Sequence, residues 1–423
     1  MQTTLADFLR NTPEGEEAKS IVGKCVHCGF CTATCPTYQL RGDELDGPRG
    51  RIYLMKQVLE GNPVTESTRL HLDRCLTCRN CESTCPSGVT YGHLVDIGRK
   101  IVDDRLEAQG IKRPAKERIV RWVLREGLTR PALFGPALRL GQIVRPWLPQ
   151  MLRNKVPASE PVAGTWPRTE HPRKMLLLDG CVQPAMSPNI NAATARVFDK
   201  LGVQLVVARE AGCCGAIRFH NGDHPGGLDN MRANIDAWWP HIEAGAEAIV
   251  MTASGCGAMV KDYGHLLRND PTYASRAARV SAMTRDLSEL LPDFTDELHR
   301  LAGAVPRDSR RVAWHPPCTL QHGQQIRGKV EALLTRLGVD VRLCADSHLC
   351  CGSAGTYSVL QPELSYKLRD DKLAKLQATS PESIVTANIG CITHLQSGTE
   401  TPVMHWVELV DRMLAPVVAA QAA

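Results

Sequence analysis

The chain has 423 residues, of which 43% are hydrophobic and 22% charged, and its formal net charge is +5. This composition is typical of a folded globular protein, the length favours two to four domains, and the mild charge does not argue for nucleic-acid binding. No apolar run approaches the roughly 18 residues of a membrane-spanning helix. The N-terminus lacks the basic and then apolar layout of a signal peptide, so we expect a cytoplasmic location.

The first 105 residues contain two short runs of four cysteines each. The sequences CVHCGFCTATCP at 25–36 and CLTCRNCESTCP at 75–86 both follow the pattern C-x2-C-x2-C-x3-C-P. Reducing compartments disfavour disulfides, so many of the 17 cysteines of the chain are expected to be metal ligands or redox groups. The runs are joined and followed by helical patterns at 49–61 and 89–110. We therefore expect a small, mostly helical domain over 1–105.

This cysteine pattern is typical of two-cluster ferredoxins, in which the fourth cysteine of each run ligates the other [4Fe–4S] cluster. The rule predicts one cluster on Cys25, Cys28, Cys31 and Cys85, and a second on Cys35, Cys75, Cys78 and Cys81. Zinc is the alternative occupant of paired CxxC motifs, but it leaves the regular third and fourth cysteines unexplained. Three residues beside these cysteines either make a nearby cluster easier to reduce or are simply solvated: Lys24, His27 and Arg79.

Residues 106–173 form a basic, proline-rich connection. Over 112–174 there are 14 Lys and Arg against 4 Asp and Glu, together with nine prolines. The stretch 116–128 has a helical period, whereas 145–174 is broken by proline. Two interpretations stay open: a linker wrapped over its neighbouring domains, or a tryptophan-bearing basic surface for anionic lipid or an acidic partner.

From residue 174 onward the chain repeats itself. Cys181 precedes Cys213 by 32 positions, and Cys318 precedes Cys350 by the same number. A further cysteine follows each CCG triplet at a similar distance. Cys256 lies 42 positions beyond Cys214, and Cys391 lies 40 positions beyond Cys351. The repeat predicts two modules, at 174–300 and 308–423.

Each module alternates strand and helix, as in KMLLLDGC at 174–181, NAATARVFDKLG at 191–202 and VQLVVA at 203–208. Such alternation predicts a parallel sheet with crossover helices. The cysteines then follow the carboxyl ends of strands, where open α/β sheets place their sites, with a Gly-Cys turn after the third strand. The overall fold class expected is multidomain α+β: a helical ferredoxin-like domain followed by two α/β modules.

No nucleotide-binding or hydrolase motif is found, neither G-x-G-x-x-G after a strand, nor a Walker loop, nor G-x-S-x-G. His315, His322 and His405 fall near predicted strand ends, where a lone histidine is more often packed or capping than catalytic. Because no acid, base or nucleophile constellation is apparent, we expect neither catalytic residues nor a flavin or substrate site in this chain.

The repeated modules resemble the cysteine-rich CCG domains of heterodisulfide reductases and related redox subunits. Together with the two N-terminal runs and the segments NIDAWWPHIEAGAEAI and HLCCGSAGTYSVL, the whole chain resembles the iron–sulfur subunits of bacterial glycolate oxidases. The resemblance implies an electron-transfer subunit of a glycolate-oxidising complex, with FAD in a partner subunit and a quinone or other membrane acceptor. It also implies attachment to the inner face of the cell membrane.

The modules depart from the disulfide-reducing pattern, which ends each module with CxxC. Met259 and His394 occupy the final positions here, so each module has four cysteines at motif positions rather than five. Five-thiolate clusters are therefore not expected, but an ordinary cluster, with His394 as a further ligand, and a set of buried redox thiols both remain open. The cysteines concerned are Cys181, Cys213, Cys214, Cys256, Cys318, Cys350, Cys351 and Cys391. Two alternative functions stay open. The chain could be a subunit of a D-lactate or glycerol-3-phosphate dehydrogenase complex, or the modules could reduce a disulfide.

Overall fold

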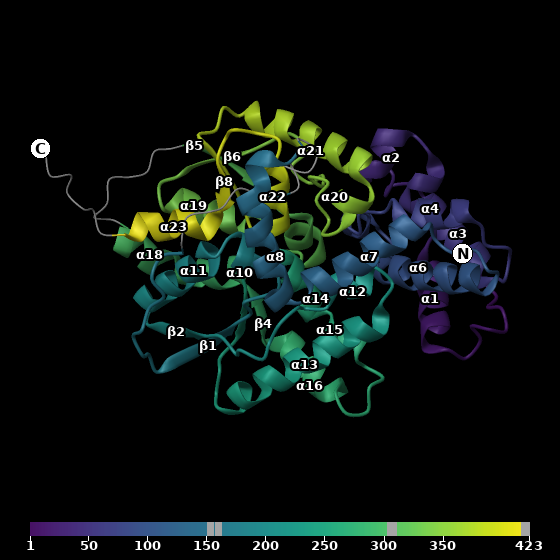
Figure 1. Ribbon diagram of the computed structural model, residues 1–423, viewed down its shortest axis with the longest axis horizontal. Coiled ribbons are helices and arrows are strands. Elements are labelled where there is room, and N and C mark those ends of the chain that lie inside the picture. Colours follow the sequence, from purple (N-terminus) through teal and green to yellow (C-terminus); the bar gives the residue numbers. More distant parts are fainter. Residues whose placement is uncertain (150–155, 157–162, 303–310, 416–423) are drawn as a thin grey trace, which may run out of the picture.

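The computed structural model of the protein describes residues 1–149, 156, 163–302 and 311–415. Its N-terminal part is helical, as predicted, and lies at one end of the long axis of the molecule, while the two sheets lie towards the other end (Figure 1). The helices are α1 (Pro13–Lys24), α2 (Pro36–Arg41), η1 (Glu44–Asp46), α3 (Pro48–Leu59), α4 (Glu66–Asp73), α5 (Asn80–Thr84) and α6 (Tyr91–Ala108).

Local sequence signals explain where these helices begin and end. Proline stands at the first position of α1, α2 and α3, where its missing N–H costs nothing. The predicted helices at 49–61 and 89–110 correspond to α3 and α6. Each is followed by a glycine in the left-handed region, Gly61 at φ +86° and Gly110 at φ +77°, which ends the helix without a Cβ clash.

The basic connection contains two helices, α7 (Ala115–Leu128) and α8 (Pro131–Val144), followed by η2 (Arg145–Trp147). The predicted helix at 116–128 is therefore present. Two parts of the proline-broken stretch predicted at 145–174, residues 150–155 and 157–162, lie outside the described residues. Among the described helices, none combines the length and the hydropathy required to cross a bilayer.

Two four-stranded sheets follow, and every strand pairing in them is parallel. The first has the order β2-β1-β3-β4 and the second the order β6-β5-β7-β8, so the two topologies are identical. This confirms the predicted pair of α/β modules. The strands are β1 (Arg173–Leu177), β2 (Val203–Val206), β3 (Ile249–Met251), β4 (Thr284–Asp286), β5 (Arg311–His315), β6 (Asp340–Leu343), β7 (Ser383–Thr386) and β8 (Val403–His405).

Helices connect the strands of both sheets. In the first module they are α10 (Gln183–Met186), α11 (Asn189–Lys200), α12 (Ala216–His220), α13 (His224–Glu243), α14 (Ser254–Lys261), α15 (Tyr263–Leu266), α16 (Ala274–Met283), α17 (Leu287–Leu290), η3 (Leu291–Phe294) and α18 (Thr295–Ala302). In the second they are η4 (Thr319–Gly323), α19 (Lys329–Arg336), α20 (Tyr357–Leu360), α21 (Pro362–Gln377), α22 (Ile389–Gln396) and α23 (Trp406–Leu414).

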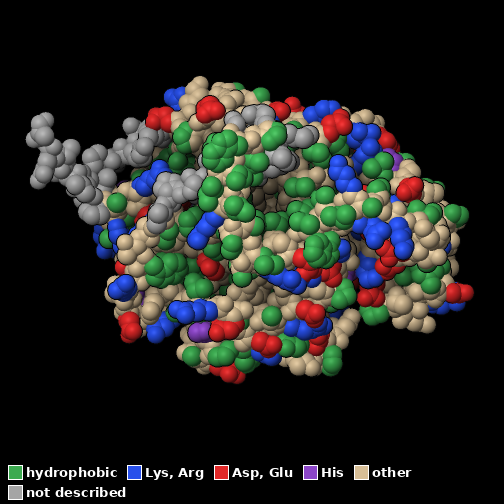
Figure 2. Space-filling model, viewed as in Figure 1, with side chains coloured by type: hydrophobic (Ala, Val, Ile, Leu, Met, Phe, Trp, Pro, Cys, Tyr) green, Lys and Arg blue, Asp and Glu red, His purple; other side chains and the backbone are tan. Residues whose placement is uncertain are grey.

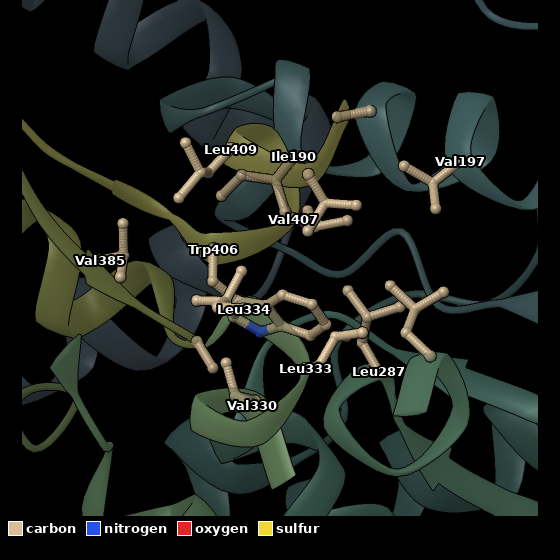
Figure 3. Close-up of a cluster of buried hydrophobic side chains, with 14 of the residues drawn as sticks. Ile190, Val197, Leu287, Val330, Leu333, Leu334, Val385, Trp406, Val407 and Leu409 are labelled. Atoms are coloured by element: carbon tan, nitrogen blue, oxygen red, sulfur yellow. The ribbon is translucent and has the colours of Figure 1, made fainter. Parts of the chain in front are cut away.

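The two modules share one hydrophobic core. Ile190 and Val197 on α11 belong to the same buried cluster as Leu333 on α19 and Trp406 on α23 (Figure 3). The Trp406 side chain is fully buried in this cluster. Because apolar side chains from both repeats are removed from water together, the modules are expected to stabilise each other.

One local prediction differs from the structure. The expected Gly-Cys turns at Cys256 and Cys391 are instead the first turns of α14 and α22. A glycine-cysteine pair after a strand fits a tight turn and a helix start equally well, so the local sequence did not separate them. The exact division of the chain at residues 105, 173, 300 and 308 remains our proposal.

Candidate metal centres

The first cysteine group surrounds a surface cavity. Cys25, Cys28 and Cys31 line it together with Cys81 and Cys85 from the second run, and the cavity holds about 430 Å³ of empty space, part of it open to solvent. Cys25 lies directly after α1 and Cys85 directly after α5, so helix ends bring the two runs together. The structure thus brings the four residues that the sequence assigned to one cluster to the same cavity, together with Cys81, which the sequence assigned to the other cluster. Which cysteine of the second run belongs to the first cluster stays a prediction.

Without a bound cation, this cavity disfavours anionic sulfur. Burial, with smaller contributions from the neighbouring cysteines, raises the pKa of Cys31 to about 11. Burial and the charge of Arg49 lower the pKa of His27, which also lines the cavity. Several thiolates gathered this closely would repel one another without a bound cation, and a metal would remove this cost.

The second cysteine group is more deeply enclosed. Burial first, and then the charges of Cys78, Cys75 and other neighbours including Cys35, raise the pKa of Cys81 well above its ordinary value. The four residues assigned to the second cluster therefore also lie within electrostatic reach of one another. Their sulfur atoms have donors nearby: the Thr77 N–H and the Tyr91 hydroxyl donate to Cys75 Sγ at 3.3 and 3.7 Å.

A buried ion-pair network holds the loops around this second group. The Asp46 carboxylate is fully buried and lies 2.9 Å from His71 Nδ1 and 3.0 Å from Arg74 Nη1. Arg51, only 1% exposed, lies 3.6 Å from the same carboxylate and donates to the His71 carbonyl. The backbone carbonyl of Asp46 accepts hydrogen bonds from Thr37 Oγ1 and Cys35 Sγ. The network therefore anchors one predicted ligand.

Ion pairs also join the N-terminal domain to the first module. Arg79 Nη1 donates to Asp262 at 3.0 Å, and Arg79 Nε lies 3.2 Å from Glu82. The two carboxylates offset the positive charge next to Cys78, which weakens the predicted effect of Arg79 on a nearby cluster. Glu17 contacts His265 at 2.8 Å across the same interface.

In both modules the cysteines form the same chain of contacts. The thiols of Cys181 and Cys213, and those of Cys214 and Cys256, lie within interaction distance of each other in the first module. In the second module the equivalent contacts join Cys318 to Cys350 and Cys351 to Cys391. The second chain of thiols is also near the ferredoxin-like domain, since Cys318 and Cys350 pack with Leu76 and Cys78.

The glycine of each CCG triplet has a steric role. Gly215 and Gly352 both have φ +89°, and a Cβ would lie 2.7 Å from the Gly227 carbonyl oxygen or 2.5 Å from that of Ser365. Their N–H groups donate to Cys213 Sγ and Cys350 Sγ at 3.4 and 3.3 Å. Only glycine fits these two positions without strain.

The histidines near the modules have different surroundings. His405 accepts from the Val407 N–H at the start of α23 and donates to the Thr252 carbonyl, and His322 donates to the His348 carbonyl. His394 Nε2 lies 3.2 Å from Ser365 Oγ. His315, by contrast, lies beside Cys351 and Cys391. Sequence reasoning grouped His315 with the packed histidines, because its neighbours come from residues 36 and 76 positions away.

Comparison with known proteins agrees with this architecture. The family of 4Fe-4S dicluster domains matches residues 21–89, and the cysteine-rich domain family matches residues 175–261 and 312–396. A lactate utilization protein A of Geobacillus thermodenitrificans is 25% identical over 56% of this chain and 98% of its own length.

Two further relatives match nearly the whole chain. The probable glycolate oxidase iron-sulfur subunit of Bacillus subtilis is 31% identical over 93% of this chain and 91% of its own length. The glycolate oxidase iron-sulfur subunit of Escherichia coli is 56% identical over 98% of this chain and 99% of its own length. At this identity and coverage, the chain belongs to the family of glycolate oxidase iron–sulfur subunits.

Proposed function

We propose that this chain is the electron-carrying subunit of a glycolate oxidase complex. It would accept electrons from a flavin-containing partner that oxidises glycolate to glyoxylate, and pass them towards a quinone or another membrane acceptor. The observation that carries the proposal is the cavity lined by three cysteines of the first run and by Cys81 and Cys85 of the second, in a chain 56% identical to a glycolate oxidase iron-sulfur subunit.

The eight N-terminal cysteines are proposed to hold two [4Fe–4S] clusters. The first would be bound by Cys25, Cys28, Cys31 and Cys85, and the second by Cys35, Cys75, Cys78 and Cys81. The crossed arrangement is supported by the position of Cys85 beside the first run, and by the influence of Cys35 on the pKa of Cys81. The matching dicluster family supports the same number of clusters.

When bound, such clusters carry single electrons, which suits the stepwise reoxidation of a reduced flavin. The residues of this chain would set the environment. Ile52 and Tyr91 line the first cavity and limit access of water. The Tyr91 hydroxyl and the Thr77 N–H donate to Cys75 Sγ, and the buried Arg51 lies near enough to offset negative charge. Hydrogen bonds and positive charge near sulfur favour the reduced state of a bound cluster.

The first cysteine group is the proposed contact point for the redox partner. Cys28 is exposed and its neighbours Val26 and Phe30 are 68% and 62% exposed, whereas the second group is enclosed. Electron transfer between proteins needs a short path, so the site nearest the surface is the better entry. We assign the oxidation of glycolate itself to the partner, because the sequence carries neither a dinucleotide-binding motif nor a hydrolase motif.

Helices α7 and α8 are the proposed membrane contact. Exposed apolar side chains follow both helices, and Figure 2 shows hydrophobic side chains gathered over this face. They are Ile119, Trp122, Val123, Leu133, Leu140, Ile143 and Trp147. Exposed basic residues accompany them at Lys116, Arg118, Arg130 and Arg139. An apolar helical face flanked by Lys and Arg is typical of helices that lie in the surface of an anionic membrane.

The membrane contact is tested with vesicles of phosphatidylglycerol and phosphatidylcholine. Replacing Ile119, Trp122 and Ile143 by serine should weaken co-sedimentation at least about tenfold, because each buried apolar side chain contributes about 1.5–3 kcal/mol. Val359→Ser changes an exposed apolar residue on α20, outside these two helices, and should leave vesicle binding unchanged. Unaltered vesicle binding by the triple variant, or binding that requires the flavin subunit, would contradict a direct lipid contact.

The relay is tested with Cys28→Ser in the complete complex. We expect the variant to lose about four iron atoms and to lose glycolate-dependent reduction of a quinone analogue, while the flavin subunit still reacts with glycolate. Cys344→Ala is the matched control, since this buried cysteine belongs to neither run and to neither module set. Undiminished quinone reduction by Cys28→Ser would contradict the relay.

A further inference from the structure

A group of three metal-binding side chains lies in the second module, at the carboxyl end of β5. Donor atoms of His315, Cys351 and Cys391 all lie within 4.8 Å of one another. All three side chains are buried, and His315 is completely inaccessible to solvent. They come from the last residue of β5, from the CCG triplet and from the first turn of α22, so only the folded module brings them together.

The imidazole of His315 has no partner that would explain its position. Neither Nδ1 nor Nε2 makes a hydrogen bond to any described residue, although both atoms are buried. A neutral imidazole has one donor and one acceptor nitrogen, and burying both unpaired is costly. Fully buried histidines in this protein are otherwise satisfied, as His405 is by Thr252 and Val407. The described protein groups therefore do not satisfy the His315 ring, and a bound ligand would.

We propose that the second module binds a single Zn²⁺ ion through His315, Cys351 and Cys391. Two sulfur ligands at 2.3 Å from a tetrahedral zinc ion lie about 3.8 Å apart, so donor atoms within 4.8 Å need only a small adjustment. Imidazole and thiolate together are the ligands that Zn²⁺ prefers in structural sites. Cys350, which contacts Cys351, is the proposed fourth ligand.

Groups around the site support the sulfur ligands. The Gly352 N–H donates to Cys350 Sγ at 3.3 Å, and the Asn388 amide lies 3.8 Å from Cys391 Sγ. Such outer contacts orient metal ligands and offset the negative charge of thiolates. The site also adjoins the second cysteine group of the N-terminal domain, because Cys350 packs with Leu76 and Cys78. A bound zinc ion, which has no redox chemistry of its own, would hold these module residues in place beside the second cysteine group.

The duplicated first module provides an internal comparison. The position that corresponds to His315, three residues before the first module cysteine, is Leu178. Leu178 is buried in the apolar cluster of the first module and offers no ligand atom. We therefore assign zinc to the second module alone, and the first module retains its four cysteines without an imidazole.

The proposal is tested by metal analysis of the full chain purified from cells grown with zinc and iron. We expect about one zinc per chain, an iron content unaffected by its removal, and loss of the zinc in His315→Leu, the residue found in the first module. His315→Cys should keep the zinc, because a thiolate replaces the imidazole. His405→Gln, which alters a buried histidine whose ring nitrogens are already hydrogen-bonded to Thr252 and Val407, should also keep the zinc.

X-ray absorption at the zinc edge gives a second measurement, with one nitrogen and three sulfur ligands expected in the wild type and four sulfur ligands in His315→Cys. A chain without zinc, a His315→Leu variant that keeps its zinc, or additional iron with sulfide at this site would each overturn the proposal. None of these outcomes depends on glycolate oxidation. Failure of the relay would appear instead as undiminished quinone reduction in Cys28→Ser.

Discussion

The N-terminal domain and the paired modules are held together by different means. In residues 1–108, a fully buried carboxylate, Asp46, and a buried guanidinium, Arg51, lie among eight cysteines. In the modules, one apolar cluster runs through both repeats and surrounds Trp406. The N-terminal domain also has its own apolar cluster, which includes Ile52, Leu94 and Val95. It therefore combines apolar burial with buried charge and proposed metal binding, whereas the core shared by the modules is apolar.

The largest effect is expected from Trp406→Ala. Removing a fully buried tryptophan leaves a cavity in the shared core and should lower the free energy of unfolding by about 3–5 kcal/mol. All seven tryptophans lie beyond residue 108, so their fluorescence reports on the modules and the connecting helices, while the visible absorbance of bound clusters reports on the N-terminal domain. Denaturant titration should therefore show a large shift of the fluorescence midpoint.

Trp406→Phe is the matched variant, because it keeps most of the apolar volume and should cost much less. Far-UV circular dichroism should follow the same shifted transition, since both sheets pack on the same cluster. Two separate transitions, with only one displaced by the alanine variant, would show that the modules do not form a single unit.

In the N-terminal domain the largest effect is expected from Asp46→Ala. The substitution leaves the Arg51 guanidinium buried without its carboxylate and should lower the free energy of unfolding by about 3–5 kcal/mol. The loss is smaller if water can reach the guanidinium. It also disturbs the loop whose carbonyl accepts from Cys35 Sγ. The midpoint of the cluster absorbance should fall well before that of the tryptophan fluorescence.

Asp104→Ala removes an exposed carboxylate paired with Lys100 in the same domain and should change stability by less than about 0.5 kcal/mol. If Asp46→Ala moved both probes together and by the same amount, the two regions would be one cooperative unit. The difference between buried charge and apolar core would then not make the two regions unfold separately.

The sequence predicted the features that are repeated or periodic. The spacing of Cys181 and Cys213, matched by Cys318 and Cys350, gave both modules, and helical periodicity gave α3 and α6. These signals are local or recur at a fixed interval, so a single chain reveals them. The gathering of Cys85 with the first run rested on the known behaviour of the ferredoxin pattern.

Contacts between distant residues were not predictable in the same way. His315 meets Cys351 and Cys391 only after β5, β7 and α22 are placed side by side, and nothing near His315 in the sequence marks it. The shared core was also missed, since an amphipathic helix such as α11 reveals that one face is buried but not which module covers it. The pairing of Arg79 with Asp262 spans 183 residues.

That pairing leads to a smaller effect at the junction of the two regions. Arg79→Ala removes charged hydrogen bonds to Asp262 and Glu82 from a side chain that is 17% exposed, and should cost about 1–2 kcal/mol. The loss should fall mainly on attachment of the N-terminal domain, so hydrogen exchange in α5 and α14 should increase. Arg10→Ala, which breaks an exposed pair with Asp7, should leave exchange unaltered. Equal effects of the two variants would show that the junction does not depend on this contact.

The smallest effect concerns the pH dependence of the same junction. Burial opposes protonation of His93, but the Asp262 carboxylate, 3.6 Å from Nε2, outweighs it and raises the pKa of His93 above its ordinary 6.5. A raised pKa in the folded state contributes stability that is complete below pH 6.5 and is lost as pH rises through the folded value. The cluster and fluorescence midpoints should therefore move apart between pH 6 and pH 9. The corresponding difference in the free energy of unfolding should be less than about 1 kcal/mol. His93→Gln should flatten this dependence, whereas an unchanged slope in the variant would assign it to another group, such as the neighbouring His265 that stacks on His93.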